Sequence, residues 1–218
     1  MKYKIVIITA LLLLVGVFAA GCGNSVTQTT SPMTTSLSNV NSVSTNAING
    51  LSLSLSLDGT TYKPSQLVSI ILDEKNMLLT TNNVPVADNL PSKELISGFT
   101  NEPSLFPFGL AILRGNYTSS NYSTAKPLII YDPIKGYIGT QVVGPTSYVF
   151  QPSSDIANLV GGNYNSNNGL KMQYKISVDR YWPNNKSTQY TKFSPGVYTV
   201  VAGDEWGALL VLHFTVSY

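Results

Sequence analysis

The sequence predicts an all-β protein, folded as an antiparallel β-sandwich in a single domain. Several short segments alternate apolar and polar residues, which is the period of a half-buried strand. Turns that contain Gly, Pro and Asn separate these segments, and no stretch has the pattern of a helix of ten or more residues. Many short strands with such turns are typical of sandwiches and barrels.

The first strand is expected at residues 51–57. The stretch "LSLSLSL" alternates strictly, so its leucines share one face and its serines the other. Asp58-Gly59 predicts a turn, and residues 67–72 read as the next strand. Further strands are expected at 108–118, 128–131, 137–143, 147–151 and 170–182.

Residues 81–106 interrupt this series. They contain Pro85, Pro91 and Pro103 and predict a long irregular insertion that would carry specificity. The best short helical candidate, "PSKELI" at 91–96, lies within it.

The first 22 residues predict an export signal. Lys2 and Lys4 precede an apolar run from Ile5 to Phe18, which is shorter than the roughly 20 residues of a membrane span. Residues 19–22, "AAGC", resemble a lipobox, although Ala19 stands where that motif prefers Leu. The resemblance implies lipidation of Cys22; the alternative is that an ordinary signal peptidase removes this cysteine. The protein is expected at the outer face of the cytoplasmic membrane or the cell surface.

Residues 23–48 are rich in Ser, Thr and Asn and predict a disordered spacer between the membrane and a domain at 49–218. The alternative is that part of this tract adds as a strand to a neighbouring subunit. Because Cys22 is the one cysteine in the chain, the domain can hold no internal disulfide.

The segment "SPGVYTVVAGDEWGALLVLHF" predicts the last two strands and the turn between them. Tyr198 follows a Pro-Gly turn by two residues, as in the tyrosine corner of immunoglobulin-like sandwiches. The fold class predicted is therefore an immunoglobulin-like antiparallel β-sandwich. Asp204, Glu205 and Trp206 are expected in a hairpin loop with both acids in solvent, and His213 on the face of the last strand away from the main core.

These residues do not predict catalysis. Paired carboxylates work as acid and base only across a cleft, and His213 has neither a cysteine nor a second histidine as a partner for a transition metal. No spaced calcium-loop motif is present. Oxygen ligands for calcium could come only from scattered acids: Asp58, Asp73, Glu74, Asp132, Asp155 and Asp179. No cofactor is expected, and an enzyme would require a pocket that gathers at least two titratable side chains.

Charge, aromatic residues and glycosylation motifs bear on which partners the chain could bind. Charged residues are 11% of the chain and nearly balanced, which argues against nucleic acid. Trp182, Trp206 and the tyrosines are expected in the core rather than on a binding face. Three N-glycosylation sequons begin at Asn116, Asn121 and Asn185, all in expected turns or strand ends.

Two stretches, "LFPFGLAILRGNYTSSNYSTAKPLIIYDP" and "FSPGVYTVVAGDEWGALLVLHFTV", are similar to a group of secreted, mostly archaeal, immunoglobulin-like proteins without an assigned activity. The resemblance covers about residues 50–218 and implies the fold, with no catalytic residues to transfer.

Two functions remain as hypotheses. The first is a non-enzymatic, membrane-tethered binding or structural module, whose partner is another surface protein or a second copy. The alternative is a filament subunit, in which the N-terminal tail completes the sandwich of the next subunit.

Overall fold

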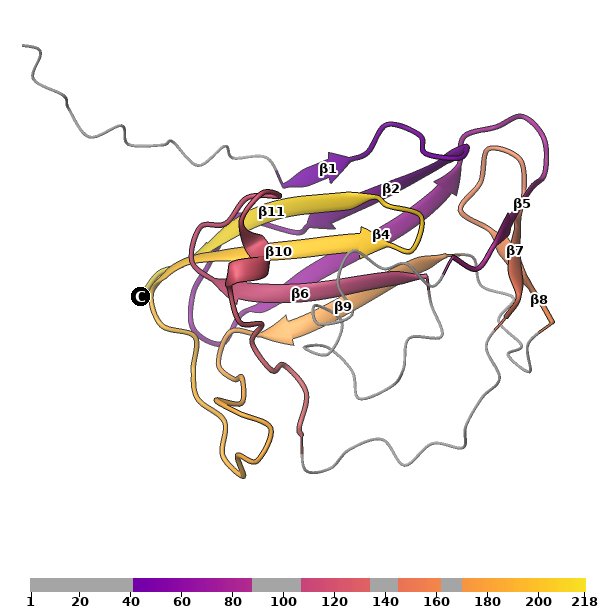
Figure 1. Ribbon diagram of the computed structural model, residues 1–218. Helices are drawn as coiled ribbons and strands as arrows, with labels where there is room; N and C mark the ends of the chain where they lie inside the picture. Colours follow the sequence, from indigo (N-terminus) through magenta and orange to yellow (C-terminus); the bar gives the residue numbers. More distant parts are fainter. Residues whose placement is uncertain (1–40, 88–106, 134–144, 162–169) are drawn as a thin grey trace, which may run out of the picture. The chain divides into compact units, whose positions relative to one another are not determined.

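The computed structural model describes residues 41–87, 107–133, 145–161 and 170–218 (Figure 1). All of them belong to one compact unit, Leu37–Tyr218. Within these ranges the chain forms short strands and one turn of 3-10 helix, η1, at Tyr122–Thr124.

The first sheet has the strand order β1-β2-β4-β9, with every neighbouring pair antiparallel. Its strands are β1 (Ser42–Ser44), β2 (Leu51–Leu57), β4 (Leu67–Asn76) and β9 (Lys171–Ser177).

The second sheet has the order β3-β11-β10-β6. Its strands are β3 (Thr61–Tyr62), β11 (Leu209–Val216), β10 (Gly196–Asp204) and β6 (Phe108–Arg114). β3 pairs parallel to the end of β11, and the other pairs are antiparallel.

A third, smaller sheet has the order β5-β7-β8. It consists of β5 (Asn82–Pro85), β7 (Ser147–Phe150) and β8 (Ala157–Val160).

The division of strands between the two larger sheets is that of the immunoglobulin fold. One sheet joins β2, β4 and β9, which correspond to strands A, B and E of that fold, and the other joins β6, β10 and β11, which correspond to C, F and G. The predicted fold class is therefore confirmed.

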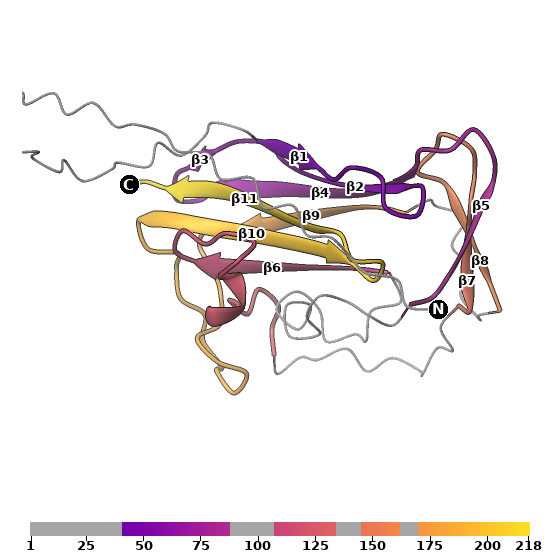
Figure 2. The ribbon, with the colours of Figure 1, turned by 45° about the horizontal axis from the view of Figure 1, so that its top comes forward.

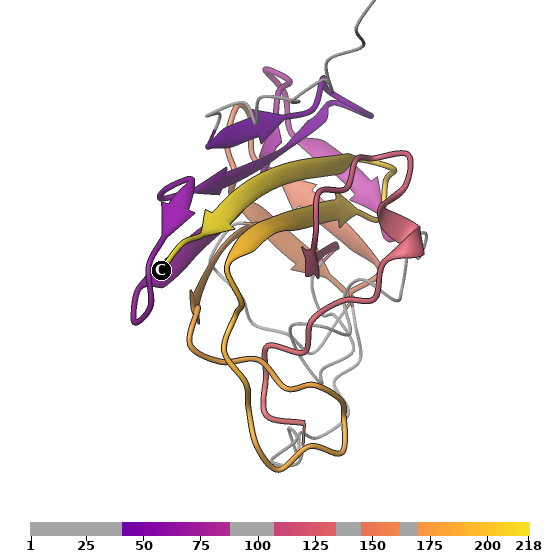
Figure 3. The same cartoon turned by 90° about the vertical axis from the view of Figure 1, so that its left-hand side faces the viewer.

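The core lies between these two sheets (Figures 2 and 3). The alternation in β2 decides which side chains reach it: Leu53 and Leu55 are fully buried, whereas the intervening serines are half-buried. Ile70 faces the core from β4 and Phe214 from β11. Each such side chain contributes about 1.5–3 kcal/mol relative to exposure, so this interface supplies most of the driving force for folding.

The outer face of the second sheet carries a smaller cluster. Ala111, Leu113 and Val201 project there and are buried with Tyr122 of η1. The segment after β6 therefore folds back over its own sheet, and β6 accordingly has buried residues on both faces.

Several strands end at other residues than the pattern predicts. β4 continues to Asn76, and β9 stops at Ser177 rather than 182. β6 stops at Arg114 rather than 118 because Gly115 follows with φ +124, outside the strand region. Residues 128–131 form one isolated bridge, between Ile129 and Trp182, instead of a strand.

The predicted spacer requires a correction. Ser42–Ser44, inside the expected disordered tract, form β1 against Ser54–Ser56 of β2, and Val43 packs against the core. The folded part therefore begins before residue 49. The prediction failed because three residues are too few to show the alternation of apolar and polar residues that identifies a strand, and the surrounding tract is rich in Ser and Thr.

The expected insertion is also partly wrong, because Asn82–Pro85 form β5 in the third sheet. Residues 88–106, with the helical candidate at 91–96, and the strand expected at 137–143 lie outside the described residues, as do the leader and Cys22. Within the described ranges, no helix has the length and hydropathy needed to span a membrane.

Candidate functional site

The turn between β10 and β11 is built by Asp204. Its Oδ1 atom accepts hydrogen bonds from the backbone amides of Trp206 (2.9 Å) and Ala208 (2.7 Å). The amide of Asp204 in turn donates to the carbonyl of Ala208 (3.1 Å). Gly207 has φ +105, a conformation that a side chain would strain. The carboxylate therefore fixes the turn, as Asp side chains commonly do.

The expectation that both acids are solvated is wrong. Asp204 is 2% exposed and Glu205 6% exposed. The amide of Glu205 donates to the carbonyl of Pro107 (2.8 Å), and its Oε1 atom accepts from the amide of Ala87 (3.3 Å). Ala87, shortly after β5, and Pro107, just before β6, thus contact the turn, and the sequence pattern predicted neither contact.

Trp206 joins this turn to the third sheet. Its Nε1 atom donates to the carbonyl of Pro85 in β5 (3.0 Å). Its ring meets Tyr148 and Phe150 of β7 edge to face, with centroid distances of 5.6 and 6.0 Å. Such aromatic pairs contribute about 0.5–1.5 kcal/mol each beyond their buried area, so Trp206 is an anchor for the third sheet.

A second acid, Glu74 of β4, faces Asp204 from the opposite sheet. Glu74 is fully buried, and among the described residues its carboxyl oxygens find no donor. Burial, followed by the charge of Asp204, raises the pKa of Glu74 to about 9. Glu74 is therefore protonated at neutral pH and donates its proton toward the Asp204 carboxylate.

Asp204 holds the charge of this pair. Burial raises its pKa, but the backbone amides of Ala208, Trp206 and Gly207 and the hydrogen bond from Glu74 all favour the ionised form. Two carboxyl groups with one proton between them can serve as an acid–base device when a substrate reaches them. Here both lie in the interior, and their hydrogen bonds hold the turn and connect the two sheets.

His213 lies on the face of β11 away from the main core, as expected. It is half-buried, and its Nε2 atom is 2.8 Å from the carbonyl oxygen of Tyr117. No three of the described His, Cys, Asp and Glu side chains are grouped to hold a metal ion. Asp58, one scattered calcium candidate, instead accepts hydrogen bonds from the hydroxyl of Tyr62 (2.7 Å) and the amide of Ser69 (2.9 Å).

Tyr198 makes the contact that defines a tyrosine corner. Its hydroxyl donates to the carbonyl of Ser194, four residues earlier (2.8 Å). Its ring stacks on Phe214 at 5.4 Å and packs on Phe193 at 4.9 Å. The residue therefore ties the loop before β10 to the core.

All three sequon asparagines are exposed in loops. Asn116 and Asn121 belong to the segment that covers the second sheet, and Asn185 lies in a turn after β9. The Oδ1 atom of Asn121 accepts a hydrogen bond from the amide of Thr118 (2.7 Å), so this bond does not use Nδ2, the atom to which a glycan would be attached.

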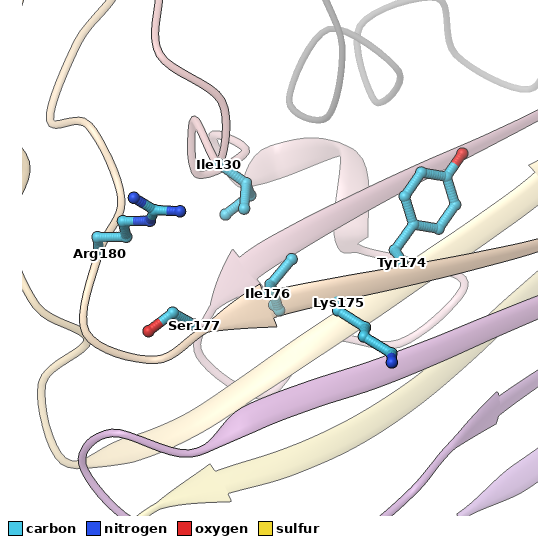
Figure 4. A pocket seen from close by; sticks show the side chains of 6 residues that line it. All are labelled: Ile130, Tyr174, Lys175, Ile176, Ser177 and Arg180. Atoms are coloured by element: carbon cyan, nitrogen blue, oxygen red, sulfur yellow. The ribbon is translucent and has the colours of Figure 1, made fainter.

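A small pocket, which the sequence pattern did not predict, lies beside β9 (Figure 4). Its volume is about 170 Å³, below the roughly 300–1,000 Å³ of typical ligand sites. The residues that line it are Ile130, Tyr174, Lys175, Ile176, Ser177 and Arg180.

This pocket gathers titratable groups but no acid–base pair. Burial raises the pKa of Tyr174 to about 12, so its phenol stays protonated at neutral pH. Figure 4 shows Arg180 reaching toward Ile130, whereas Lys175 points away from both. No carboxylate or histidine lines the pocket, and the two cations do not converge on one point.

Comparisons with known proteins assign no family. No family model matches the chain, and no curated protein does. Solved structures that it resembles include a mutant β-glucosidase from Listeria innocua in complex with laminaribiose (TM-score 0.35, 8% identity, 77% of this chain and 16% of that chain). Another is the Listeria innocua β-glucosidase in complex with gluconolactone (TM-score 0.33, 8% identity, 81% and 16%). The chain thus spans 16% of the length of those proteins, at a similarity too low to carry a function.

Proposed function

We propose that this chain is a membrane-tethered, extracellular β-sandwich that acts by binding and not by catalysis. The observation that carries the proposal concerns residues 204–206, which contain the adjacent acid pair and a tryptophan. The side chains of all three residues form hydrogen bonds within the fold. Asp204 holds a turn, Glu205 receives the amide of Ala87, and Trp206 donates to Pro85. These contacts stabilise the fold, and they leave Asp204 and Glu205 buried, with 2% and 6% of their surface exposed.

The tether is proposed from the leader and Cys22, and the position of Asn41 is compatible with it. The carbonyl of Asn41 accepts the amide of Leu57 (2.7 Å), at the end of β2. A chain that leaves the domain there can continue through the Ser/Thr-rich tract to an acylated cysteine. The three sequon asparagines are exposed, so they could accept glycans in an extracellular setting.

The test is the mass of the N-terminal peptide of protein extracted from its native membranes. We expect a diacylglycerol on Cys22, and we expect Cys22→Ser to move the protein from the membrane to the soluble fraction. Ser25→Ala is the matched control, because it changes a neighbouring small polar residue and leaves the cysteine. An unmodified N-terminus beyond residue 22 would contradict the tether.

A second candidate, the filament subunit, is favoured by one observation. β1 is a three-residue edge strand that comes from the N-terminal tail, and its Val43 side chain packs against the core. In a filament, this strand would leave its own sandwich and pair with β2 of the next subunit. Protein that sediments at very high mass and has an unmodified N-terminus beyond residue 22 would support the filament. An acylated Cys22 would contradict it.

A further inference from the structure

Four exposed apolar side chains lie at one end of the sandwich. Met77, Leu78 and Leu79 follow one another in the loop after β4 and are 52%, 42% and 89% exposed. Ile156, 48% exposed, lies in the adjacent loop between β7 and β8. We call these four residues the apolar tip. Single exposed apolar residues are ordinary, but such a concentration is a feature of interaction surfaces.

The loop that carries the apolar tip is held by Asn76, which is fully buried. The Nδ2 atom of Asn76 donates to the carbonyls of Thr80 (2.9 Å) and Gln151 (3.0 Å), and its Oδ1 atom accepts from the amide of Leu78 (3.0 Å). The amide of Ser153 donates to the carbonyl of Leu78 (2.9 Å), which joins the two loops. A loop fixed in this way keeps its apolar side chains in solvent and loses little entropy when it binds.

The apolar tip is at the opposite end of the sandwich from the point where the chain enters it. Asn41 contacts Leu57 at one end of β2, whereas Leu51, at the other end, pairs with Asn76 just before the tip (Figure 1). The seven residues of β2 separate these points by about 20 Å. The direction of the tip rests on the proposed function: with a tether at Cys22, the tip faces away from the anchoring membrane.

Among the described residues, the charged side chains close to the apolar tip balance one another. Lys75 and Lys171 are offset by Asp73 and Asp155, and Asp73 is within electrostatic reach of the other three. The Nζ atom of Lys171 is 3.8 Å from Oδ2 of Asp73. A neutral apolar surface with a balanced rim is complementary to itself, since two copies bury apolar area without repulsion between like charges.

We propose that the apolar tip is a self-association surface, through which a second copy of this chain binds end to end. Its location favours contact between molecules anchored on facing surfaces, and an isologous contact places Leu79 of each copy at the interface.

Sedimentation velocity of the full-length chain in detergent micelles tests this proposal. We expect a reversible dimer for the wild type. Leu79→Ser should weaken it by about 100-fold or more, because one buried leucine is lost from each copy. Leu67→Ser is the matched control: Leu67 is also an exposed leucine (55%), but it begins β4, at the other end of the strand. The Leu67→Ser variant should dimerise with the same dissociation constant as the wild type. Circular dichroism should show that all three proteins are folded.

Two results would overturn the proposal. One is a wild-type chain that stays monomeric at the highest concentration reached; the other is equal weakening by the two substitutions. Hydrogen exchange on the same samples shows whether the apolar tip binds a second copy of the chain or lipid. Protection of residues 77–79 that rises with protein concentration means a second copy, and protection that rises with detergent concentration means that the tip binds lipid instead. A monomer that still carries a diacylglycerol would refute self-association alone and leave the tether standing.

Discussion

Replacing Glu74 with glutamine should stabilise this protein at neutral pH, although Glu74 is buried in the core. The change keeps the size and shape of the side chain and removes an ionisable proton. An amide at this position can still donate to the Asp204 carboxylate, so the contact between the two sheets is retained. In the wild type, folding at neutral pH requires Glu74 to take up a proton that the unfolded chain has lost, which costs free energy. The glutamine variant does not have this cost.

The magnitude follows from the pKa of Glu74, which is about 9 in the folded protein against an ordinary value of 4.5. Because the folded state binds the proton more tightly, the free energy of unfolding is highest below pH 4.5 and falls as pH rises toward 9. The slope for one proton is about 1.4 kcal/mol per pH unit. Between pH 4.5 and pH 7 the loss is therefore about 3 kcal/mol, and the raised pKa of Asp204 acts in the same direction.

Urea denaturation at several pH values between 5 and 8 measures this effect. We expect the wild-type free energy of unfolding to fall across this range and that of Glu74→Gln to change much less, so that the variant is more stable at pH 8. Asp179→Asn, which removes a half-buried carboxylate from the loop after β9, is the matched control and should keep the wild-type slope. A wild type whose stability rises from pH 5 to pH 8, or a variant less stable than the wild type at pH 8, would refute the reasoning.

Three other substitutions test the anchors of the fold. Tyr198→Phe removes the hydrogen bond to Ser194 and keeps the ring, so it should cost about 1 kcal/mol in urea denaturation; an unchanged midpoint would contradict a structural corner. Trp206→Phe removes the bond to Pro85 and should speed hydrogen exchange in β7 more than in β2, whereas equal acceleration would mean that the ring does not anchor the third sheet. Thr199→Val leaves the amide of Tyr117 and the carbonyl of Gly115, both in half-buried residues, without their shared hydroxyl partner and should cost about 2–4 kcal/mol, while a loss below 1 kcal/mol would count against that bridge.

The parts of the fold that could be predicted are those in which one face of a strand is buried. The leucines of β2 and the alternation of β11 follow directly from period-two burial, and the two strands define one wall of the core each. Tyr198 was identifiable because its motif is local, with the acceptor carbonyl four residues away. Short edge elements such as β1 and β3 carry no such period, because two or three residues are too few to establish one.

The pairing of Glu74 with Asp204 could not be predicted, because it depends on residues 130 positions apart that lie on different sheets. The strand pattern places Glu74 on the same face as Leu72, which is buried. A charged residue on a core face was therefore the one sign in the sequence that Glu74 needs a partner. A buried acid on a core face must find a partner or keep its proton, and here it does both. The adjacent pair Asp204 and Glu205 looked more like a functional site only because its two members are neighbours in sequence. The structure separates them: Asp204 turns inward to Glu74 and its own hairpin, and Glu205 turns toward the segment after β5, so no two acids of this group share an accessible surface.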